Sequence, residues 1–525
     1  MIARMPTGVF KHLENRFLCG AMNIHNMSER SSGILLHISS LASRGEIGTL
    51  GKKAYEFVDF LARTGTRIWQ VLPVGPTGYG DSPYQSFSVF AGNPYFIDIE
   101  KLRDEGLLSD EDVTSTSVFS EKTDYFALYR TRLNVLRKAF KNAGKSTLSE
   151  AEKFVRQNRD ISEFAFFSAV KERFHGIAWQ DWDDGIRSRS AYAIDQYRRE
   201  LSQETAFHGF VQYLFFRQWL ALKSYANKKG VLIFGDMPIY AALDSSDVWS
   251  NAELFSLDGN LAPKAVAGVP PDYFSEDGQL WGNPLYNWEA LKQTGYDWWV
   301  RRMKQNALMF DIVRIDHFIG LVNYYYVPFG AKNARSGVWR QGPGKALFNA
   351  INGKTGKLRI VAEDLGTITD NVRELMDELG LCGMRVMCFG FDSDDKNEHI
   401  PFNVPKKCVY YTGTHDNDTI LGTLKGFSAS KKAFAEEVLG IEKGIKISAL
   451  AEKCVDEAFM SKADTVIVPF QDICGLDSEA RMNTPGICDG SNWRWRMNPD
   501  ALSGIVEKRL SKLNIMSGRY ASLPL

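Results

Sequence analysis

DIVRIDHF, residues 311–318, is a short run of apolar and β-branched residues that ends in charged ones. Such residues favour a strand, whose side chains point alternately to its two faces. Arg314 and Asp316 therefore share one face, while Val313 and Ile315 share the other. Because an unpaired buried carboxylate is costly, a buried strand rarely ends in one without a reason. We predict a buried strand that carries a charged pair at its carboxyl end.

Seven similar runs occur elsewhere, each rich in Ile, Val, Phe or Tyr and each ending in a polar or Gly/Pro cluster. Helix-length segments fit between them, such as the amphipathic stretches 51–64 and 370–380. Strands joined by helical crossovers are typical of a parallel sheet. Eight strand–helix units are the number that closes a (β/α)8 TIM barrel of the α/β class. The eight predicted strands are 33–40, 67–75, 231–239, 311–318, 358–366, 383–391, 408–416 and 465–473.

The intervals between these runs are uneven. The runs that begin at 358, 383 and 408 follow one another after 25 residues, whereas much longer stretches follow the second and third runs. We therefore predict large, mostly helical insertions after strands 2 and 3, at about 76–230 and 240–300. Both would form walls around the mouth of the barrel, because they follow the carboxyl ends of strands. The catalytic barrel itself is expected to span 33–525.

The N-terminal residues 1–32 mix basic residues with Glu14 and Glu29, and they lack the continuous apolar core of a secretory signal. We expect a mobile extension without a function of its own. A transit peptide, which would place the protein in a plastid, is the alternative. The seven cysteines are scattered and contain no CxxC motif, which favours reduced thiols and the cytoplasm.

The composition argues against several partners. The chain has 525 residues, and its 63 Lys and Arg balance its 63 Asp and Glu. Nucleic-acid binding usually requires a basic excess, so no nucleic-acid partner is expected. No stretch approaches the ~18 apolar residues of a membrane-spanning helix, so no membrane partner is expected either. The eight histidines form no close pair at metal-ligand spacing, and we predict neither a metal ion nor a cofactor.

Four of the eight runs end in an acidic residue, namely Asp236, Asp316, Glu363 and Asp416. The reactive groups of (β/α)8 barrels lie at the carboxyl ends of the strands. Any one of these acids could be a helix cap or a salt-bridge partner, but four at one rim indicate a reactive site. A guanidinium beside a carboxylate keeps it ionised, as a nucleophile must be, and Arg314 stands in that position next to Asp316. A plain Arg–Asp bridge is the alternative.

Two assignments stay open at this point. In AEDL, residues 362–365, the spacing does not decide which acid faces the mouth. In THDN, residues 414–417, the His and Asp could be metal ligands, although no complementary His pair supports this. Two carboxyl groups that flank one bond are the machinery of glycoside cleavage. Aromatic residues that could stack on sugar rings occur near Tyr79, Tyr84, Tyr273, Phe274 and Trp281, although most aromatic residues belong to a core.

With these residues in view, the sequence resembles the 4-alpha-glucanotransferases, also called amylomaltases or disproportionating enzymes (glycoside hydrolase family 77). The similarity runs from about Ser32 to about Pro524. One departure lies at the first strand, where the family commonly reads HPTSLP and GIGDLG and this chain reads HISSLA (37–42) and EIGTLG (46–51), which leaves the geometry of that loop open. The matching segments are YGDSPYQSFSVFAGNP (79–94), GDMPIYAALDSSDVW (235–249), GVPPDYFSEDGQLWGNPLYNW (268–288), VRIDHFIGL (313–321), AEDLG (362–366), YTGTHDNDT (411–419), EARMNTPG (479–486) and NWRWR (492–496).

The resemblance implies a role for each acid. Asp316 would be the nucleophile, Glu363 rather than its neighbour Asp364 the general acid/base, and Asp416 the group that stabilises the transition state by binding sugar hydroxyls. Loop 268–276 resembles the family's flexible lid. The substrate-binding residues implied are Arg314, His317, His415, Asp236, Tyr79, Tyr84, Tyr273, Phe274, Trp281 and Asn483. The family also lacks a C-terminal β-domain, and only 52 residues follow the eighth run here.

The implied activity is transfer of an α-1,4-glucan segment from a donor maltodextrin to the 4-hydroxyl of glucose or another glucan, by a retaining double displacement through a covalent β-glucosyl-enzyme. The implied substrates are maltooligosaccharides and glucans derived from starch or glycogen. The main alternative is an α-glucan hydrolase of the amylase type. A carbohydrate-binding protein that has lost its activity and a metal-dependent barrel hydrolase are two further hypotheses.

Overall fold

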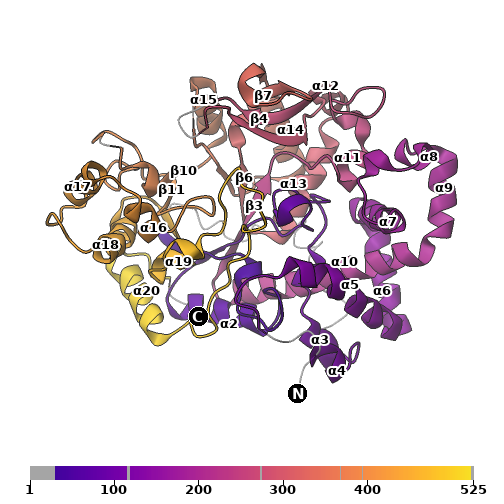
Figure 1. Ribbon diagram of the computed structural model, residues 1–525, viewed down its shortest axis with the longest axis horizontal. Coiled ribbons are helices and arrows are strands. Elements are labelled where there is room, and N and C mark those ends of the chain that lie inside the picture. Colours follow the sequence, from indigo (N-terminus) through magenta and orange to yellow (C-terminus); the bar gives the residue numbers. More distant parts are fainter. Residues whose placement is uncertain (1–29, 115–118, 272–274, 367, 393, 522–525) are drawn as a thin grey trace.

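Eight parallel strands form the centre of the molecule (Figure 1). The computed structural model describes residues 30–114, 119–271, 275–366, 368–392 and 394–521. From the N-terminus the strands are β1 (Ser31–Leu35), β2 (Ile68–Gln70), β3 (Leu232–Pro238), β6 (Ile312–Asp316), β9 (Ile360–Ala362), β10 (Gly383–Val386), β11 (Cys408–Tyr411) and β12 (Thr465–Pro469). They pair in the order β10-β11-β12-β1-β2-β3-β6-β9. The ring closes where the N–H of Ala362 donates to the carbonyl of Cys382 at 2.8 Å.

Every predicted run overlaps one of these strands, so the (β/α)8 barrel is confirmed. β12 is buried at all five positions, as expected for a parallel strand with both faces covered. β1 begins at Ser31, two residues before the predicted run. Residues 1–29 of the predicted N-terminal extension lie outside the described residues.

Helices cover the outside of the barrel. α2 (Lys52–Arg63) and α15 (Asp370–Leu379) lie where the amphipathic stretches predicted them. None of the helices in the described part of the chain is long and apolar enough to cross a bilayer. The other elements around the barrel are η1 (Ile38–Ser40), α13 (Asp297–Met309), η6 (Phe318–Leu321), α14 (Lys345–Thr355), η8 (Met387–Phe389), α16 (Ile420–Lys425), α17 (Ala429–Val438), α18 (Ile447–Met460), α19 (Phe470–Ile473), η9 (Ser478–Ala480) and α20 (Gly504–Met516).

The segment between β2 and β3 forms a helical subdomain at one end of the molecule (Figure 1). Its longest helix, α10 (Ser202–Lys228), packs against α7 and α6. The side-chain amide of Gln212 in α10 accepts from the N–H and donates to the carbonyl of Gly92. The amide of Gln218 forms the same two hydrogen bonds with the backbone of Asp98. These bonds fix the loop that leads from β2 across the barrel mouth. The other elements are η2 (Tyr79–Asp81), η3 (Pro94–Phe96), α3 (Ile99–Asp104), α4 (Asp110–Thr114), α5 (Tyr125–Asn142), α6 (Lys145–Gln157), α7 (Arg159–Arg173), η4 (Trp179–Asp181), α8 (Asp184–Arg187) and α9 (Ala191–Glu200).

A four-stranded antiparallel sheet rises beside the barrel mouth, and the sequence analysis did not anticipate it. Its order is β5 (Gln279–Pro284), β4 (Ala265–Val269), β7 (Asn323–Pro328), β8 (Val338–Gln341). Two strands come from the insertion after β3 and two follow β6, so their pairing spans a barrel strand and is not visible in a local pattern. The insertion after β3 therefore mixes strand with helix. Its other elements are α11 (Ser246–Ser250), η5 (Ala252–Leu254) and α12 (Trp288–Gln293), and η7 (Ala334–Ser336) connects β7 to β8.

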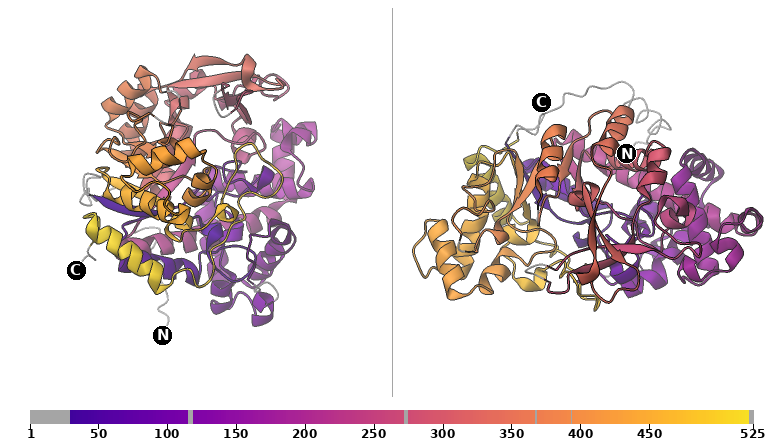
Figure 2. Two further views of the ribbon diagram at one scale, coloured as in Figure 1. Left: turned by 60° about the vertical axis from the view of Figure 1, so that its left-hand side comes forward. Right: turned by 90° about the horizontal axis from the view of Figure 1, so that it is seen from above.

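The C-terminal helix is fastened to the first strand. Figure 2 shows α20 beside the N-terminal part of the barrel, and Ser32 of β1 donates from its hydroxyl to the side-chain oxygen of Asn514 at 2.5 Å. Just after α20, Arg519 is buried, and its guanidinium donates to five backbone carbonyls at 2.7–3.0 Å. These carbonyls belong to Ser31, Phe459, Ser461, Ala463 and Asp464.

We expect Arg519→Ala to be strongly destabilising, because it leaves these buried carbonyls without a donor. The loss should be about 3 kcal/mol of unfolding free energy, the scale for removing one partner of a buried charged network. Differential scanning calorimetry of the variant should show an apparent Tm several degrees below that of the wild type. Arg44→Ala is the control, since Arg44 is an exposed arginine that forms a 3.6 Å pair with Glu100. Equal Tm values for the two variants would contradict the assignment.

Candidate active site

Three neighbouring strands bring four charged side chains to one point of the barrel mouth. β6 lies between β3 and β9, and its register pairs Arg314 with Asp236 of β3. On its other edge the N–H of Glu363, just after β9, donates to the carbonyl of Ile315 at 3.0 Å. Asp316 ends β6 and thus lies between the ends of its two neighbours. The predicted convergence of these strand-end acids is therefore a property of the sheet register.

Arg314 is the centre of this group. Its Nη1 lies 2.8 Å from both carboxylate oxygens of Asp236 and 2.9 Å from Oδ1 of Asp316. Burial opposes the charge on the guanidinium, but the two carboxylates outweigh it and hold the pKa of Arg314 well above its ordinary value. Burial raises the pKa of Asp236, and Arg314 opposes this effect. Asp316 keeps 28% of its side chain exposed, so its carboxylate is accessible from the groove.

Glu363 has different surroundings. Its two oxygens accept hydrogen bonds from the N–H groups of His317 and Leu365, both at 2.8 Å. Burial, reinforced by the charge of Asp316 and opposed by Arg314 and these two donors, raises the pKa of Glu363 to about 7. A carboxyl group with this pKa is able to hold and to release a proton near neutral pH.

Asp364, the alternative to Glu363, is engaged elsewhere. Its oxygens accept from the N–H of Met384 at 2.6 Å and from Nη1 of Arg385 at 2.9 Å. Both donors belong to β10, so this carboxylate fastens β9 to its neighbour. Of the two acids that the spacing left open, Glu363 is the one that lies among the site residues.

Asp416 follows β11 on the other side of the mouth. Its Oδ1 accepts from Nδ2 of Asn483 at 2.6 Å and lies 3.2 Å from Nε2 of His415. Arg481 donates to the backbone carbonyls of Asp416 and Asn483 at 2.7 and 2.8 Å, which ties the two segments together. The side chain of Asp416 is 45% exposed. Its second oxygen has no bond within this network and is therefore free for a ligand.

Tyr84 connects the two sides of the mouth. Its hydroxyl donates to Oδ2 of Asp236 at 2.8 Å, and its ring stacks on His415 with centroids 5.0 Å apart. Burial raises the pKa of Tyr84, and the charges of Asp236, Asp316 and Asp416 add to the effect. A single phenol therefore lies within electrostatic reach of three of the four predicted acids.

His317 and Trp281 form the wall on the Glu363 side. His317 has a positive φ of 51°, a conformation that is strained for a non-glycine residue and typical of functional positions. Its ring meets Trp281 edge-on at 4.8 Å, and burial lowers its pKa to about 4. Gly320 permits this arrangement, because a Cβ there would lie 2.9 Å from the His317 ring. Nε2 of His317 is buried without a hydrogen-bond partner in the described residues.

The other predicted aromatic residues are placed less decisively. Tyr79 lies on η2 at the rim and is 80% exposed, and no hydrogen bond or ring contact of the described residues joins it to the acids. Tyr273 and Phe274, the predicted lid residues, lie outside the described residues.

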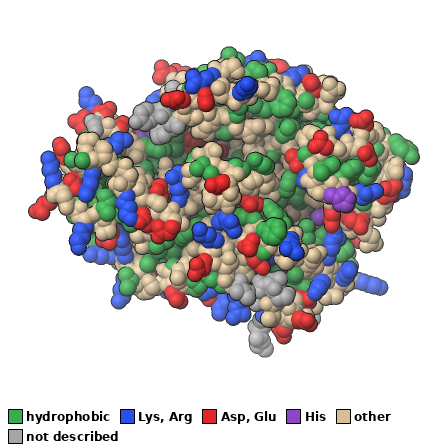
Figure 3. Space-filling view, viewed as in Figure 1, with side chains coloured by type: hydrophobic (Ala, Val, Ile, Leu, Met, Phe, Trp, Pro, Cys, Tyr) green, Lys and Arg blue, Asp and Glu red, His purple; other side chains and the backbone are tan. Residues whose placement is uncertain are grey.

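Figure 3 shows that the face of the molecule seen in Figure 1 is hollowed near its centre, with hydrophobic side chains along the hollow.

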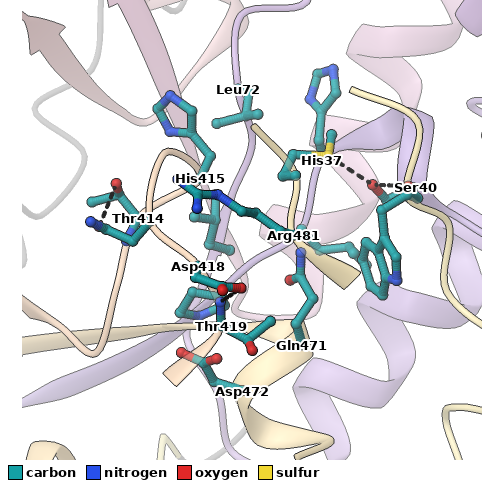
Figure 4. Close-up of a pocket in the computed structure, with 16 residues that line it drawn as sticks. His37, Ser40, Leu72, Thr414, His415, Asp418, Thr419, Gln471, Asp472 and Arg481 are labelled. Carbon is teal, nitrogen blue, oxygen red and sulfur yellow. Dashed lines mark hydrogen bonds between the residues drawn. The ribbon is translucent and has the colours of Figure 1, made fainter. Parts of the chain in front are cut away.

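The structure adds site residues that the sequence analysis did not single out. Trp493 packs on Tyr84 and on His415 with centroids 5.8 and 5.9 Å apart, and it has a positive φ of 65°. In the sequence Trp493 is marked only by its place in the NWRWR segment. The argument from acids at strand ends does not lead to it. His415 also lines a cavity together with His37, Gln471 and Arg481 among others, and Figure 4 shows these side chains around it.

The departure at the first strand is accommodated locally. Thr49 stands where the family usually has Asp, and its hydroxyl donates to Asp98 at 2.6 Å. Arg496 binds the carbonyls of Leu41, Ser43 and Gly45 and so holds the preceding loop. Across the described residues, no group of three His, Cys, Asp or Glu side chains has an arrangement that could hold a metal ion.

Comparison with known proteins gives the family. A sequence model described as 4-alpha-glucanotransferase matches residues 36–502. The chain belongs to the 4-alpha-glucanotransferase family. It is 43% identical to the 4-alpha-glucanotransferase of Streptococcus pneumoniae over 94% of this chain and 98% of that one. It is 44% identical to the enzyme of Thermus thermophilus over 90% and 96% of the two chains.

A solved structure supports the same relation. The amylomaltase of Streptococcus agalactiae in complex with acarbose superposes with a TM-score of 0.90, at 40% identity over 94% of this chain and 100% of that chain. The chain thus shares with the 4-alpha-glucanotransferases both the barrel and the segments that carry the acids. The activity of this family is transfer of glucan segments, and nothing in the comparisons favours the hydrolase alternative over it.

The raised pKa of Glu363 predicts a pH-dependent stability. In the unfolded chain a Glu has a pKa of about 4.3, so between that pH and about 7 the folded protein binds more protons than the unfolded one. The free energy of unfolding should therefore fall as pH rises through this window. Glu363→Gln lacks this penalty, and its Tm relative to the wild type should be higher at pH 8 than at pH 5.

Thermal unfolding of both proteins at several pH values measures this difference. Glu289→Gln, a change of the same type at an exposed position of α12, is the control and should give a constant difference. A Glu363→Gln difference that stays constant or shrinks with pH would contradict a raised pKa of Glu363.

Proposed function

We propose that Asp316 is the nucleophile and Glu363 the acid/base of a retaining glucan transfer. Glu363 protonates the glycosidic oxygen while Asp316 attacks the anomeric carbon, so that the bond to the leaving fragment breaks and a β-glucosyl-enzyme forms. The carboxylate of Glu363 then takes the proton of an acceptor's 4-hydroxyl, and this oxygen displaces Asp316. Two inversions give an α-1,4 bond again.

The observation that carries this proposal is the contrast between two carboxyl groups on adjacent strands. One is bound to a buried guanidinium at 2.9 Å, and the other is buried with a pKa raised to about 7. Glycosidases assign their roles through such a difference in environment. The guanidinium also holds Asp316 in one orientation, which an attacking group requires.

Asp416 is proposed to bind hydroxyls of the distorted sugar in the transition state. Asn483 and His415 hold one of its oxygens, which leaves the other for the sugar. His317, whose Nε2 has no hydrogen-bond partner in the described residues, is proposed as a second group that binds the sugar. Asp236 and Tyr84 orient Arg314 and the sugar, through the bonds that join all three. These hydrogen bonds gain most where charge develops on the ring.

The proposed substrates are maltooligosaccharides and α-1,4-glucans derived from starch or glycogen, with glucose or a glucan as acceptor. The relative of known structure binds acarbose, an oligosaccharide analogue, and the aromatic wall of Trp281 and His317 beside Glu363 suits the next sugar of such a chain. An acceptor oriented on this wall is able to compete with water for the intermediate. Tyr273 and Phe274 are proposed to extend this wall as part of a lid.

We also propose that the protein works in the cytoplasm. The six cysteines of the described residues are all free thiols, as expected in a reducing compartment.

Replacement of Asp316 tests the nucleophile. Incubation of the wild type with maltotriose should give glucose together with longer maltodextrins, which is the product pattern of transfer. Asp316→Asn should lower the rate by roughly a thousandfold or more, because the amide does not attack the anomeric carbon. Asp500→Asn, an exposed change far along the chain, is the control. Turnover at the wild-type rate in Asp316→Asn would refute the assignment, and shorter sugars alone from the wild type would favour the hydrolase.

The pH profile tests the acid. Because Glu363 must carry a proton to release the leaving fragment, kcat/KM for maltotriose should fall about tenfold per pH unit above the pKa of about 7. An α-maltosyl fluoride donor releases fluoride, which needs no proton. With this donor kcat/KM should lose the alkaline decline. The same decline with both donors would mean that a group other than Glu363 controls it.

A further inference from the structure

One face of the antiparallel sheet carries aromatic and polar side chains beyond Trp281. Trp281 and Gln279 lie two residues apart on β5 and therefore share a face, and the Trp281 indole N–H donates to Gln279 at 3.1 Å. Val269 of β4 pairs with Gln279 and lies on the same face. The register of β4 and β5 shifts between Val266 and Gly268, but Val266 packs in a different buried cluster from Ala265 and Ala267 and therefore points to the opposite face.

The register extends this assignment to the other two strands. Val266 pairs with Val327 of β7, so Val327 lies on the opposite face and its neighbours Tyr324 and Tyr326 lie on the face of Trp281. On β8, Arg340 pairs with Tyr324, and Val338 pairs with Tyr326. We call the set Gln279, Trp281, Tyr324, Tyr326, Val338 and Arg340 the Trp281 face.

The two faces of the sheet differ in what they pack against. On the opposite face, Val266, Tyr325, Val327 and Ala334 form a small buried cluster of their own. On the Trp281 face, Tyr324 and Tyr326 are half-buried, whereas Val338 and Arg340 are exposed. Trp281, Tyr324 and Tyr326 pack against the main core with part of their side chains, and the rest of their aromatic surface is exposed.

The Trp281 face begins at the catalytic centre. Trp281 contacts His317 at 4.8 Å, and it lies 6.3 Å from Tyr240, ring centre to ring centre. Tyr240 is buried, and its burial, together with the nearby phenols of Tyr286 and Tyr324, raises its pKa. Tyr324 therefore lies near Tyr240, and β4 separates its strand from that of Trp281.

Strand β7 also begins on the Glu363 side of the centre. Asn323, the first residue of β7, donates to Thr369 at 3.3 Å and to Asn371 at 3.1 Å, in the segment that follows Glu363. An acid that protonates the glycosidic oxygen lies next to the leaving fragment. The sheet therefore extends from the side on which leaving and acceptor sugars bind.

The chemistry of the outer part of this face suits a sugar chain. The Arg340 guanidinium lies 3.6 Å above the ring centre of Tyr326, and no carboxylate of the described residues lies within 4.0 Å of it. A guanidinium fixed on a ring presents several N–H donors to hydroxyl groups, while aromatic rings offer apolar contact. A glucose residue has hydroxyl groups around its rim and apolar faces. The guanidinium could bind the hydroxyl groups, and the aromatic rings could contact the apolar faces.

We propose that Tyr324, Tyr326 and Arg340 form an extended subsite that binds the acceptor-side glucose residues of a maltooligosaccharide beyond the one next to Glu363. This proposal rests on the function proposed above. It makes the sheet a determinant of acceptor length, with long acceptors reaching Tyr326 and Arg340 and glucose not reaching them. Continuity of the face with the catalytic wall identifies a glucan as the occupant.

The experiment separates acceptor binding from donor binding. α-Maltotriosyl fluoride serves as donor, because its leaving fluoride does not occupy the acceptor side, and glucose and maltopentaose serve as acceptors in parallel. The measured quantity is the ratio of kcat/KM for maltopentaose to that for glucose. Tyr326→Ala and Arg340→Ala should each lower this ratio about tenfold, and Tyr326→Phe should restore most of it because the ring is kept.

Trp339→Ala is the matched control. Trp339 lies on β8 between Val338 and Arg340, is half-exposed like them, and points to the opposite face because it pairs with Tyr325. Its ratio should equal that of the wild type. If the wild type is active and the ratio of kcat/KM values is unchanged in Tyr326→Ala and Arg340→Ala, the proposed subsite is wrong. The same conclusion holds if these variants keep the ratio and change only the oligomeric state in gel filtration. Absence of transfer in the wild type would refute the proposed function instead.

Discussion

A buried guanidinium between two carboxylates is the constraint on which the site depends. Arg314 is buried at the barrel mouth, where it binds Asp236 at 2.8 Å and Asp316 at 2.9 Å. Each of these charges would be costly there alone, and removal of any one leaves the others uncompensated. Through Asp236 the same network fixes Tyr84, and through the Tyr84 ring it reaches His415 and the far side of the mouth. The candidate site is therefore one connected set of charges and rings.

The neighbouring strand supplies the opposite environment. Glu363 lies one strand away from Asp316, yet burial dominates its energetics and raises its pKa to about 7. The peptide after Asp316 adopts a left-handed conformation at His317, and this turn aims the His317 N–H at Glu363 at 2.8 Å. A strained backbone residue thus couples the two carboxyl groups. The barrel tolerates this strain because β3, β6 and β9 are hydrogen-bonded along their length.

Much of the fold could be predicted from local pattern. Eight apolar runs with polar ends correspond to eight barrel strands, and the period of two in VRID placed Arg314 and Asp316 on one face. The antiparallel sheet could not be predicted, because β4 pairs with β7 across an intervening barrel strand and no local period records that pairing. Trp493 was missed for a related reason, since its packing on Tyr84 joins segments about 400 residues apart.

The sequence by itself determined the barrel, the strand-end acids and the family resemblance, because these depend on short periods and on motifs contiguous in the chain. The residue pattern left the Glu363–Asp364 pair open, and the tertiary structure favours Glu363 independently of the family resemblance, since Asp364 binds Arg385 of the next strand. It also decided the difference in environment between Asp316 and Glu363, and the direction in which the Trp281 face extends. Burial, pKa and the face of a sheet depend on neighbours that are remote in sequence, and the register of strands sets those neighbours.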